Sequence, residues 1–157
     1  QFAVAAGART WVTSSKKDVI DQCESMGAEG GVNYKEPDAI KSLAKSIGGF
    51  DIIIDSAGGD GMNTLLMALA SGGKLVFYGA TQGAPSQIPV HAMFWNHWSL
   101  IGSTMGSDED FIKMLEFVKE RKLKPVVDKV FALDDAPMAF ERIKESLQFG
   151  KIVVKVS

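Results

Sequence analysis

Four adjacent side chains combine two hydroxyls with two positive charges, a set that can bind a phosphate group. Ser14, Ser15, Lys16 and Lys17 follow the short run Arg9–Thr13, which predicts a buried strand. Hydroxyl and ammonium groups make charge-assisted hydrogen bonds to phosphate oxygens. In a nucleotide-binding α/β sheet, such a strand ends at the adenosine ribose, where an acidic residue binds a 2′-hydroxyl. Since residues 14–17 include no acid, the sequence favours a ligand with a 2′-phosphate.

Ser15 also suits a purely structural role. A serine just before a helix can cap its free N–H groups, and Asp18 three residues later approximates a capping box. The two lysines would then face solvent. The structural role and the phosphate-binding role are compatible with each other.

The elements that must position these residues alternate regularly between strand and helix. The run Asp51–Asp55 is continuously apolar between its acids, which is typical of a strand covered on both faces of a parallel sheet. Strand–helix alternation predicts right-handed crossovers and a doubly wound α/β fold. The predicted strands are Thr10–Ser14, Gly31–Tyr34, Phe50–Ser56, Lys74–Gly79, Trp98–Ser103, Val126–Leu133 and Lys151–Val156.

Helices are predicted where apolar residues recur at helical spacing, and glycine marks their ends because it adopts left-handed backbone angles without strain. Residues 1–6 are expected to be the tail of a helix that Gly7 ends. Three further helices are expected to end at Gly27, at Gly48-Gly49 and at Gly72-Gly73. Their apolar faces are Val19, Ile20, Cys23 and Met26; Ile40, Leu43, Ala44 and Ile47; and Leu65, Leu66 and Leu69.

The C-terminal part predicts three more helices. The first is a short aromatic helix over 89–95, and Ser107 is the expected N-cap of the second. Asp134 is the expected cap of the third, which Gly150 would end. The residues expected to point inward are Phe111, Ile112, Leu115 and Val118, then Ala139, Phe140, Ile143 and Leu147.

Composition is that of an ordinary globular domain. The 157 residues are 46% hydrophobic and 23% charged, with a net charge of −2, which gives no bulk electrostatic case for nucleic acid or an anionic membrane. The single cysteine, Cys23, excludes an internal disulfide, suits a reducing compartment and predicts a cytoplasmic protein. On an apolar helix face, it is expected to be a small core residue. No linker interrupts the pattern, so residues 1–157 are expected to form one domain.

Eight short runs, in this order and spacing, give the chain a wider resemblance. It resembles the cofactor domain of the medium-chain dehydrogenases/reductases, the superfamily of zinc-type alcohol dehydrogenases and quinone oxidoreductases. The runs are Gln1-Phe2-Ala3, Ala6-Gly7-Ala8, Thr13-Ser14-Ser15, Met26-Gly27-Ala28, Val32-Asn33-Tyr34, Ile54-Asp55-Ser56-Ala57-Gly58, Gly72-Gly73-Lys74 and Gly150-Lys151-Ile152-Val153.

The resemblance implies a Rossmann-type domain truncated before Gln1. Its first strand and Gly-rich phosphate loop would be missing, as would the catalytic domain, so the piece is expected to be inactive alone. The whole enzyme would transfer hydride between NADP(H), with NAD(H) as the alternative, and a carbonyl, alcohol or activated alkene. The resemblance leaves zinc in the parent enzyme undecided. It also implies a small-molecule substrate and a homodimer formed through the segment around residues 89–103.

Further cofactor contacts come from the ends of the other strands. Small residues at Ser56 and Ala57 would let the backbone approach a ligand. The resemblance implies that Tyr34 helps Ser14, Ser15 and Lys17 hold the phosphate, although a half-buried strand-end tyrosine is an equal alternative. It also places near the nicotinamide or its ribose Gly79, Ala80, Thr81 and Thr104, and it brings Lys151 toward the cofactor unless that lysine is only a surface residue.

Other patterns carry no chemistry. Gly59-Asp60-Gly61 partly matches a dinucleotide fingerprint, but Thr64 replaces the third glycine, so a tight strand-to-helix turn is the better interpretation. His91 and His97 are wrongly spaced for a metal pair on a helix and suit aromatic packing. No residue set in the chain predicts a catalytic or metal site. The alternative to an enzyme is a non-catalytic Rossmann module that binds a nucleotide.

Overall fold

The computed structural model describes residues 1–156 and divides them into two compact units. One unit, here the 9–107 unit, runs from Arg9 to Ser107; the other, here the terminal unit, combines residues 1–8 with residues from Asp108 onward. Each unit is described by itself. The expectation of a single domain stays a prediction.

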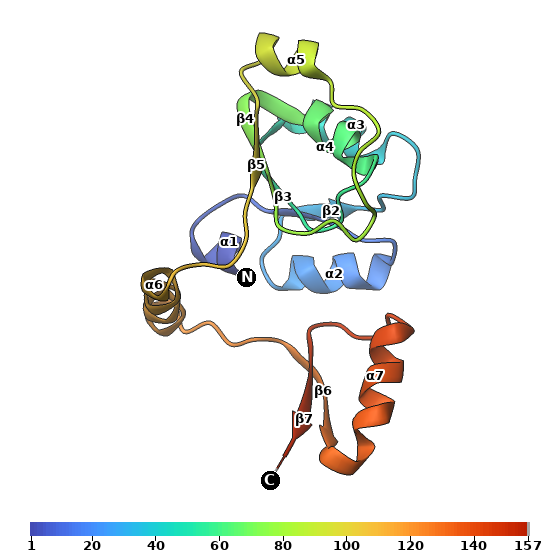
Figure 1. The fold of residues 1–157 in the computed structure, drawn as a ribbon, viewed down its shortest axis with the longest axis vertical. Helices are drawn as coiled ribbons and strands as arrows, with labels where there is room; N and C mark the ends of the chain where they lie inside the picture. The colour runs from blue at the N-terminus through green and yellow to red at the C-terminus, as the bar shows by residue number, and fades with distance from the viewer. Residues whose placement is uncertain (157) are drawn as a thin grey trace. The chain divides into compact units, whose positions relative to one another are not determined.

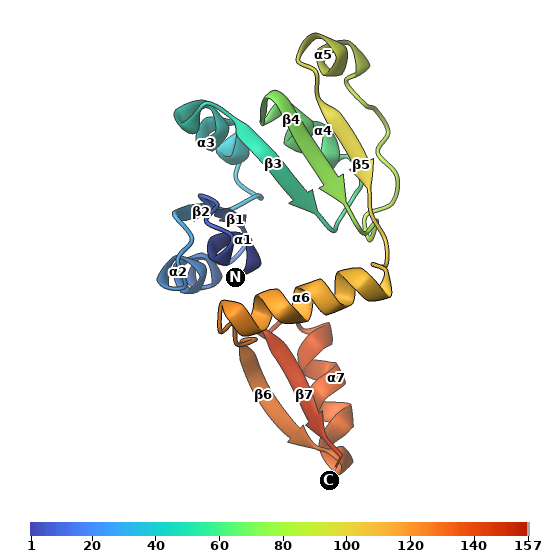
Figure 2. The same ribbon diagram turned by 90° about the vertical axis from the view of Figure 1, so that its left-hand side faces the viewer.

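Every strand pair in the 9–107 unit is parallel, which confirms the predicted α/β class. One sheet has the order β1-β2 and the other has the order β3-β4-β5, whose strands run side by side in Figure 2. No ladder joins β1 to β3. The elements, which Figure 1 labels, are β1 (Trp11–Thr13), α2 (Lys17–Ser25), β2 (Gly30–Val32), α3 (Ala39–Ile47), β3 (Phe50–Asp55), α4 (Gly61–Met67), β4 (Leu69–Phe77), α5 (Val90–Trp95) and β5 (Ser99–Gly102).

The core of this unit lies between α4 and one face of the three-stranded sheet (Figure 2). Leu66 of the helix and Leu75 of β4 are fully buried, and Met62 and Leu69 complete the buried cluster. Removing these apolar side chains from water is the main free-energy gain that holds α4 on the sheet. This packing fixes the sheet, and the loops that follow β3 and β4 start from its carboxyl-terminal edge.

The opposite face of β3 corrects a prediction. Ile52 and Ile54 have 61% and 68% of their surface exposed, so the elements of the 9–107 unit cover the strand on one face rather than on both. Side chains alternate across a strand, and α4 packs on the face that carries Ile53. The continuous apolar run therefore misled because it identifies apolar residues without identifying what covers them.

The predicted end of the helix that carries Leu65, Leu66 and Leu69 is also wrong. Helix α4 ends at Met67, and Leu69 already belongs to β4, where it pairs with Phe50. Gly72-Gly73 lies inside that strand, where the ladder shifts register before Lys74 pairs with Ile52. The glycines thus accommodate a β-bulge instead of ending a helix.

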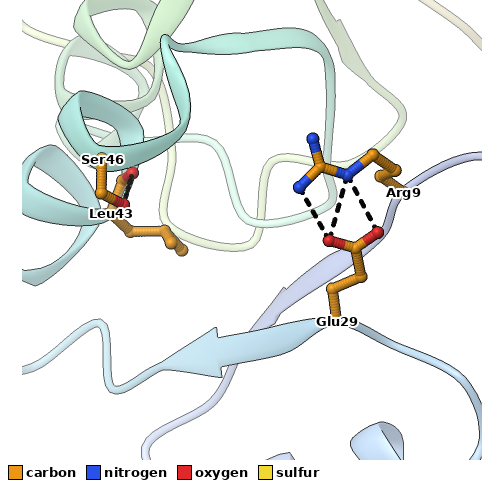
Figure 3. Close-up of polar contacts among 4 residues, drawn as sticks. All are labelled: Arg9, Glu29, Leu43 and Ser46. Atoms are coloured by element: carbon orange, nitrogen blue, oxygen red, sulfur yellow. Dashed lines mark hydrogen bonds and ion pairs between the residues drawn. The ribbon is translucent and has the colours of Figure 1, made fainter.

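An exposed polar contact joins the amino-terminal ends of β1 and β2. The Arg9 guanidinium donates to both carboxylate oxygens of Glu29, with Nε and Nη2 each 2.9 Å from one of them (Figure 3). Arg9 also lies over the Trp11 ring, 5.0 Å from its centroid. This pair supports the start of the strands and lies at the opposite end from the predicted phosphate site. Figure 3 also shows Ser46 donating to the Leu43 carbonyl within α3.

The terminal unit contains a parallel pair of strands with a helix between them in sequence. The Phe2 ring stacks on Phe117, with ring centroids 5.9 Å apart, and this contact ties the first helix to α6. Its elements are α1 (Phe2–Ala5), α6 (Asp108–Glu120), β6 (Val127–Ala132), the 3₁₀ turn η1 (Leu133–Asp135), α7 (Ala136–Lys144) and β7 (Lys151–Lys155).

Two helix boundaries differ from prediction in this unit. The N-cap of α7 is Asp135 rather than Asp134, because Leu133–Asp135 first forms a 3₁₀ turn. The helix ends at Lys144, well before Gly150, and Ser146 already has a left-handed φ of 54°. Gly150 instead makes the turn into β7, with φ of 98°.

The expected inward faces of α6 and α7 are largely exposed within this unit. Phe111 and Ile112 have 59% and 56% of their surface exposed, and Phe140 has 70%. Ala139 is buried, with 3% of its surface exposed. Leu115, Ile143 and Leu147 are about half exposed as well. The β6–β7 sheet has two strands, so it covers only a small part of α7.

A bidentate ion pair fixes α7 on β6. Arg142 Nε lies 2.5 Å from Asp128 Oδ2, and the same carboxylate accepts a hydrogen bond from the Phe149 N–H at 3.2 Å. The hydrogen bond from Arg142 lowers the pKa of Asp128 to about 2.

No helix within residues 1–156 is long and apolar enough to cross a membrane.

Candidate functional site

The carboxyl ends of β1 and β2 lie side by side and form what we call the β1–β2 edge, residues 14–17 and 33–36. Thr13 pairs with Val32, and the Ser14 N–H then donates to the Val32 carbonyl at 3.1 Å. Tyr34 follows two residues later and is 53% exposed. The structure thus brings the serine and the tyrosine of the predicted phosphate site to neighbouring strand ends.

Ser14 shapes the turn that leads into α2. Its hydroxyl oxygen accepts a hydrogen bond from the Lys16 N–H at 3.1 Å. Lys16, in an extended conformation, is the N-cap of the helix, and its side chain makes no capping hydrogen bond. The predicted capping role of Ser15 is therefore wrong, because the helix begins one residue later than that role requires.

Lys17 is the first residue of α2 and is 85% exposed at its side chain. Its Nζ lies 2.7 Å from Asp21 Oδ1, one helical turn away, and this hydrogen bond raises the pKa of Lys17. Exposed ion pairs of this kind contribute little to stability. A phosphate that approaches the edge can consequently replace the Asp21 carboxylate at low cost.

The loops after β3 and β4, residues 56–60 and 79–86, form a second region, the β3–β4 edge. Asp55 ends β3, and its two carboxylate oxygens accept hydrogen bonds from the Ala57 N–H at 3.1 Å and the Gly58 N–H at 2.8 Å. Gly58 and Gly59 both have left-handed φ angles, 69° and 66°. The backbone therefore turns sharply as it leaves the strand.

Backbone hydrogen bonds then connect this turn to the loop after β4. The Gln82 N–H donates to the Ala57 carbonyl and the Gly59 N–H donates to the Gly83 carbonyl, each at 2.8 Å. A Cβ atom on Gly79 would collide with the Ser56 carbonyl oxygen, so only glycine permits this approach. Five predicted residues are thereby brought together, namely Ser56, Ala57, Gly79, Ala80 and Thr81.

Asp60 anchors the far end of the same loop. Its Oδ1 accepts a hydrogen bond from the Ser86 N–H at 2.6 Å, and this bond lowers the pKa of Asp60. Helix α4 begins directly afterwards at Gly61. The prediction that Gly59-Asp60-Gly61 forms a tight strand-to-helix turn is confirmed.

Two further predicted residues belong to neither loop. Thr104 follows β5 and comes just after Ser103, whose N–H donates to the Phe77 carbonyl at 2.9 Å at the end of β4. Lys151 belongs to the terminal unit, where its backbone N–H donates to the Val126 carbonyl at 2.8 Å and β7 begins. A role for Lys151 in cofactor binding stays a prediction.

Sequence reasoning missed the two carboxylates that shape the β3–β4 edge. Asp55 and Asp60 each accept backbone N–H groups in turns, a pattern typical of aspartate beside glycine and serine. An aspartate at the end of a strand, followed by Ser-Ala-Gly-Gly, was the available signal. This signal was missed because the small residues after Asp55 favoured an interpretation as ligand contacts rather than as supports of the loop.

The histidines take part in packing. His91 lies 5.0 Å from the Phe94 ring and 6.2 Å from the Trp95 ring, which agrees with the predicted aromatic role, whereas His97 adopts a left-handed turn. Among residues 1–156, no three His, Cys, Asp or Glu side chains gather in a way that could hold a metal ion. These residues therefore do not fit a zinc site.

The terminal unit has a shallow hollow of about 420 Å³ between β6 and α7. Phe131, Met138 and Leu147 give it a mostly apolar lining, with Arg142 at its margin. None of the predicted site residues lines it. Its charged lining residues are Lys129, Glu141, Glu145 and Arg142, and Arg142 is paired with Asp128.

Comparison with known proteins gives the family. The model of the family described as "Zinc-binding dehydrogenase" matches residues 1–120. The chain is 34% identical to the zinc-type alcohol dehydrogenase-like protein YogA of Leptosphaeria maculans, over 99% of this chain and 46% of that protein. It is 30% identical to trans-enoyl reductase pgmF of Aspergillus terreus, over 92% of this chain and 44% of that protein.

Solved structures agree with this relationship. The crystal structure of an NAD-dependent alcohol dehydrogenase superposes with a TM-score of 0.87 at 32% identity, and the match covers 99% of this chain and 47% of that one. The chain thus spans about half the length of the relatives it matches. Its α/β fold with parallel strands is of the Rossmann type. The chain belongs to the zinc-binding dehydrogenase family, within the medium-chain dehydrogenases/reductases.

Proposed function

We propose that the chain is the cofactor-binding part of an oxidoreductase that transfers hydride between NADP(H) and a carbonyl, alcohol or activated alkene. Family membership supports a nicotinamide cofactor, and the relatives' names include both alcohol dehydrogenases and an enoyl reductase. The cofactor, when bound, supplies the hydride chemistry. The residues of this chain bind and orient it.

The choice of NADP(H) rests on one observation, the absence of a carboxylate among residues 14–17, which directly follow β1. Ser14, Ser15 and Lys17 stand where an acid would bind a ribose 2′-hydroxyl. Ser14 and Lys17, with Tyr34 on the neighbouring strand end, offer hydroxyls and an exposed ammonium group to a 2′-phosphate. The NAD-dependent relative makes NADH the competing cofactor.

The nicotinamide half of the cofactor is proposed to lie along the β3–β4 edge. Dinucleotides bind across the carboxyl ends of the strands, so the half beyond the adenosine extends away from β1. The contacts proposed there are Ser56, Ala57, Gly79, Ala80, Thr81 and Thr104; Lys151 is proposed from the family resemblance alone. We assign no catalytic residue and no zinc ligand within residues 1–156.

Calorimetry on the full-length protein tests this function. NADPH and NADH are titrated into the wild type, into the double variant Ser14→Asp, Lys17→Ala, and into Lys45→Ala, which removes an exposed lysine from α3 as a control for charge. We expect the wild type to prefer NADPH and the double variant to lose at least about tenfold in NADPH affinity, since each charged contact to phosphate is worth about 1.5–3 kcal/mol. NADH binding by the double variant should not weaken, because the new carboxylate can accept a hydrogen bond from the ribose 2′-hydroxyl. The Lys45→Ala control should change either affinity by less than about twofold.

Each alternative result has a distinct meaning. If NADH binds at least as well as NADPH, the phosphate assignment is wrong while the oxidoreductase assignment stands. If neither nucleotide binds, a non-catalytic module for another nucleotide becomes the better account.

The intact enzyme is further proposed to be a cytoplasmic homodimer that acts on a small-molecule substrate. Helix α5 exposes Phe94 and Trp95 by 60% and 68%, beside the edge strand β5. Large exposed aromatics are typical of association surfaces. Light scattering that gives a monomer mass at every concentration of the intact protein would rule out the dimer.

A further inference from the structure

We infer that Asp55 is a positioning residue for the cofactor: its carboxylate holds the loops after β3 and β4 together as one rigid wall. The inference rests on the proposed function, because that function places the nicotinamide half of the dinucleotide along this wall. Asp55 was not among the residues predicted to contact the cofactor. Its role is argued from the hydrogen bonds of the 9–107 unit alone.

The carboxylate of Asp55 uses both oxygens within its own turn. Oδ1 accepts from the Ala57 N–H at 3.1 Å and Oδ2 accepts from the Gly58 N–H at 2.8 Å, in a partly buried setting. Hydrogen bonds to an ionised acceptor are about twice as strong as those between neutral groups. These two bonds set the direction in which the chain leaves the sheet.

That direction decides whether the second loop can dock. With Ala57 and Gly58 held, the Ala57 carbonyl accepts from Gln82 and the Gly59 N–H donates to Gly83. The Asp55 carbonyl also accepts from the Tyr78 N–H at 3.0 Å, just before Gly79. One residue therefore supports the 56–60 loop through its side chain and the start of the 79–86 loop through its backbone.

Asp55 acts through the backbone rather than by touching the ligand. Because Oδ1 and Oδ2 already accept N–H donors, the carboxylate is directed at its own turn. Asparagine at this position would keep the size of the side chain but offer a single acceptor oxygen. Alanine would offer none, so the loss of function should grow from asparagine to alanine.

The test separates the two halves of the cofactor. Calorimetry on the full-length protein compares NADPH with adenosine 2′,5′-bisphosphate, which contains the adenosine end and lacks the nicotinamide. For Asp55→Ala we expect NADPH to bind about tenfold more weakly, and for Asp55→Asn about threefold, on the scale of one to two lost hydrogen bonds. The bisphosphate should bind each variant within about twofold of the wild type, because it reports on the β1–β2 edge.

Glu29→Gln is the matched control, since it weakens the bidentate pair with Arg9 at the opposite end of the strands. It should change neither affinity. Equal losses for both ligands in the Asp55 variants would overturn the inference, because they indicate general loss of structure. Unchanged NADPH binding in Asp55→Ala would overturn it as well, and Asp55→Asn provides the same test if the alanine variant does not fold.

The controls distinguish this inference from the proposed function. If the wild type binds NADH but not the bisphosphate, the phosphate assignment fails; NADH and adenosine 5′-monophosphate then form the ligand pair, with the same expected split. If the wild type binds no nicotinamide dinucleotide, the proposed function fails and this inference fails with it.

Discussion

The two strand-end regions of the 9–107 unit are built differently. At the β3–β4 edge, Asp55 and Asp60 accept backbone N–H groups, and further backbone hydrogen bonds join the 56–60 loop to the 79–86 loop. At the β1–β2 edge, the groups suited to a phosphate are exposed side chains such as Lys17 and Tyr34. One region therefore has a shape set by its backbone, and the other has a charge set by a few replaceable side chains.

This difference suggests a division of roles. A wall built from backbone tolerates few substitutions, because each glycine and each capping carboxylate supports the conformation of several other residues in the two loops. An edge that relies on exposed side chains can change its ligand preference by substitution at one or two positions, with little effect on folding. Cofactor preference is then easier to alter than the position of the reacting end.

The largest expected effect comes from filling the tightest contact in the backbone wall. In Gly79→Ala, the new Cβ collides with the Ser56 carbonyl, so the two loops must separate. We expect a loss of about 1–3 kcal/mol in the free energy of unfolding, measured by urea denaturation. Gly61→Ala is the matched control, since a Cβ there meets nothing within 4 Å and alanine favours a helix. Equal stability of the two variants would show that the wall is not rigid.

An intermediate effect should appear at acid pH. The hydrogen bond from the Ser86 N–H lowers the pKa of Asp60, so its ionised form stabilises the fold above the ordinary carboxyl pKa of about 4 and that contribution is lost as pH falls below it. Thermal melting between pH about 5 and 2 should therefore show a steeper loss in the wild type than in Asp60→Asn. Parallel curves would remove Asp60 from the support of the wall.

The smallest expected effect lies at the β1–β2 edge. Asp21→Asn removes the carboxylate that competes with a phosphate for Lys17. Because an exposed ion pair is worth little, NADPH affinity should rise by only about twofold, NADH affinity should not change, and the melting temperature should stay nearly constant. Calorimetry at low and high salt checks this, and a rise for NADH as well would mean that Lys17 does not meet the 2′-phosphate.

Sequence patterns predicted the order of elements well because each strand or helix carries its own periodicity. They failed where partners decide the outcome: Gly72-Gly73 follows a helical face, yet the pairing of Leu69 with Phe50 draws that stretch into β4. The exposure of Ile52 and Ile54 could not be predicted either, since a run of isoleucines does not reveal which face of the strand another element covers.

The candidate site shows the same limit. Strand ends can be found from composition. The neighbouring positions of Ser14 and Tyr34 then followed from the prediction that their strands are parallel. The hydrogen bonds from Ala57 and Gly58 to Asp55 depend on left-handed backbone angles at two glycines, which composition permits without requiring.

The sequence of β3 has a consequence for the nascent chain. Three consecutive isoleucines, Ile52–Ile54, form a short apolar segment with high strand propensity that is unpaired until the sheet forms. Such a segment invites cross-β stacking with identical copies. Asp51 and Asp55 flank it, and in an in-register stack their charges would lie next to like charges, which opposes assembly. We therefore expect the carboxylate that shapes the loop in the folded protein also to oppose aggregation during synthesis.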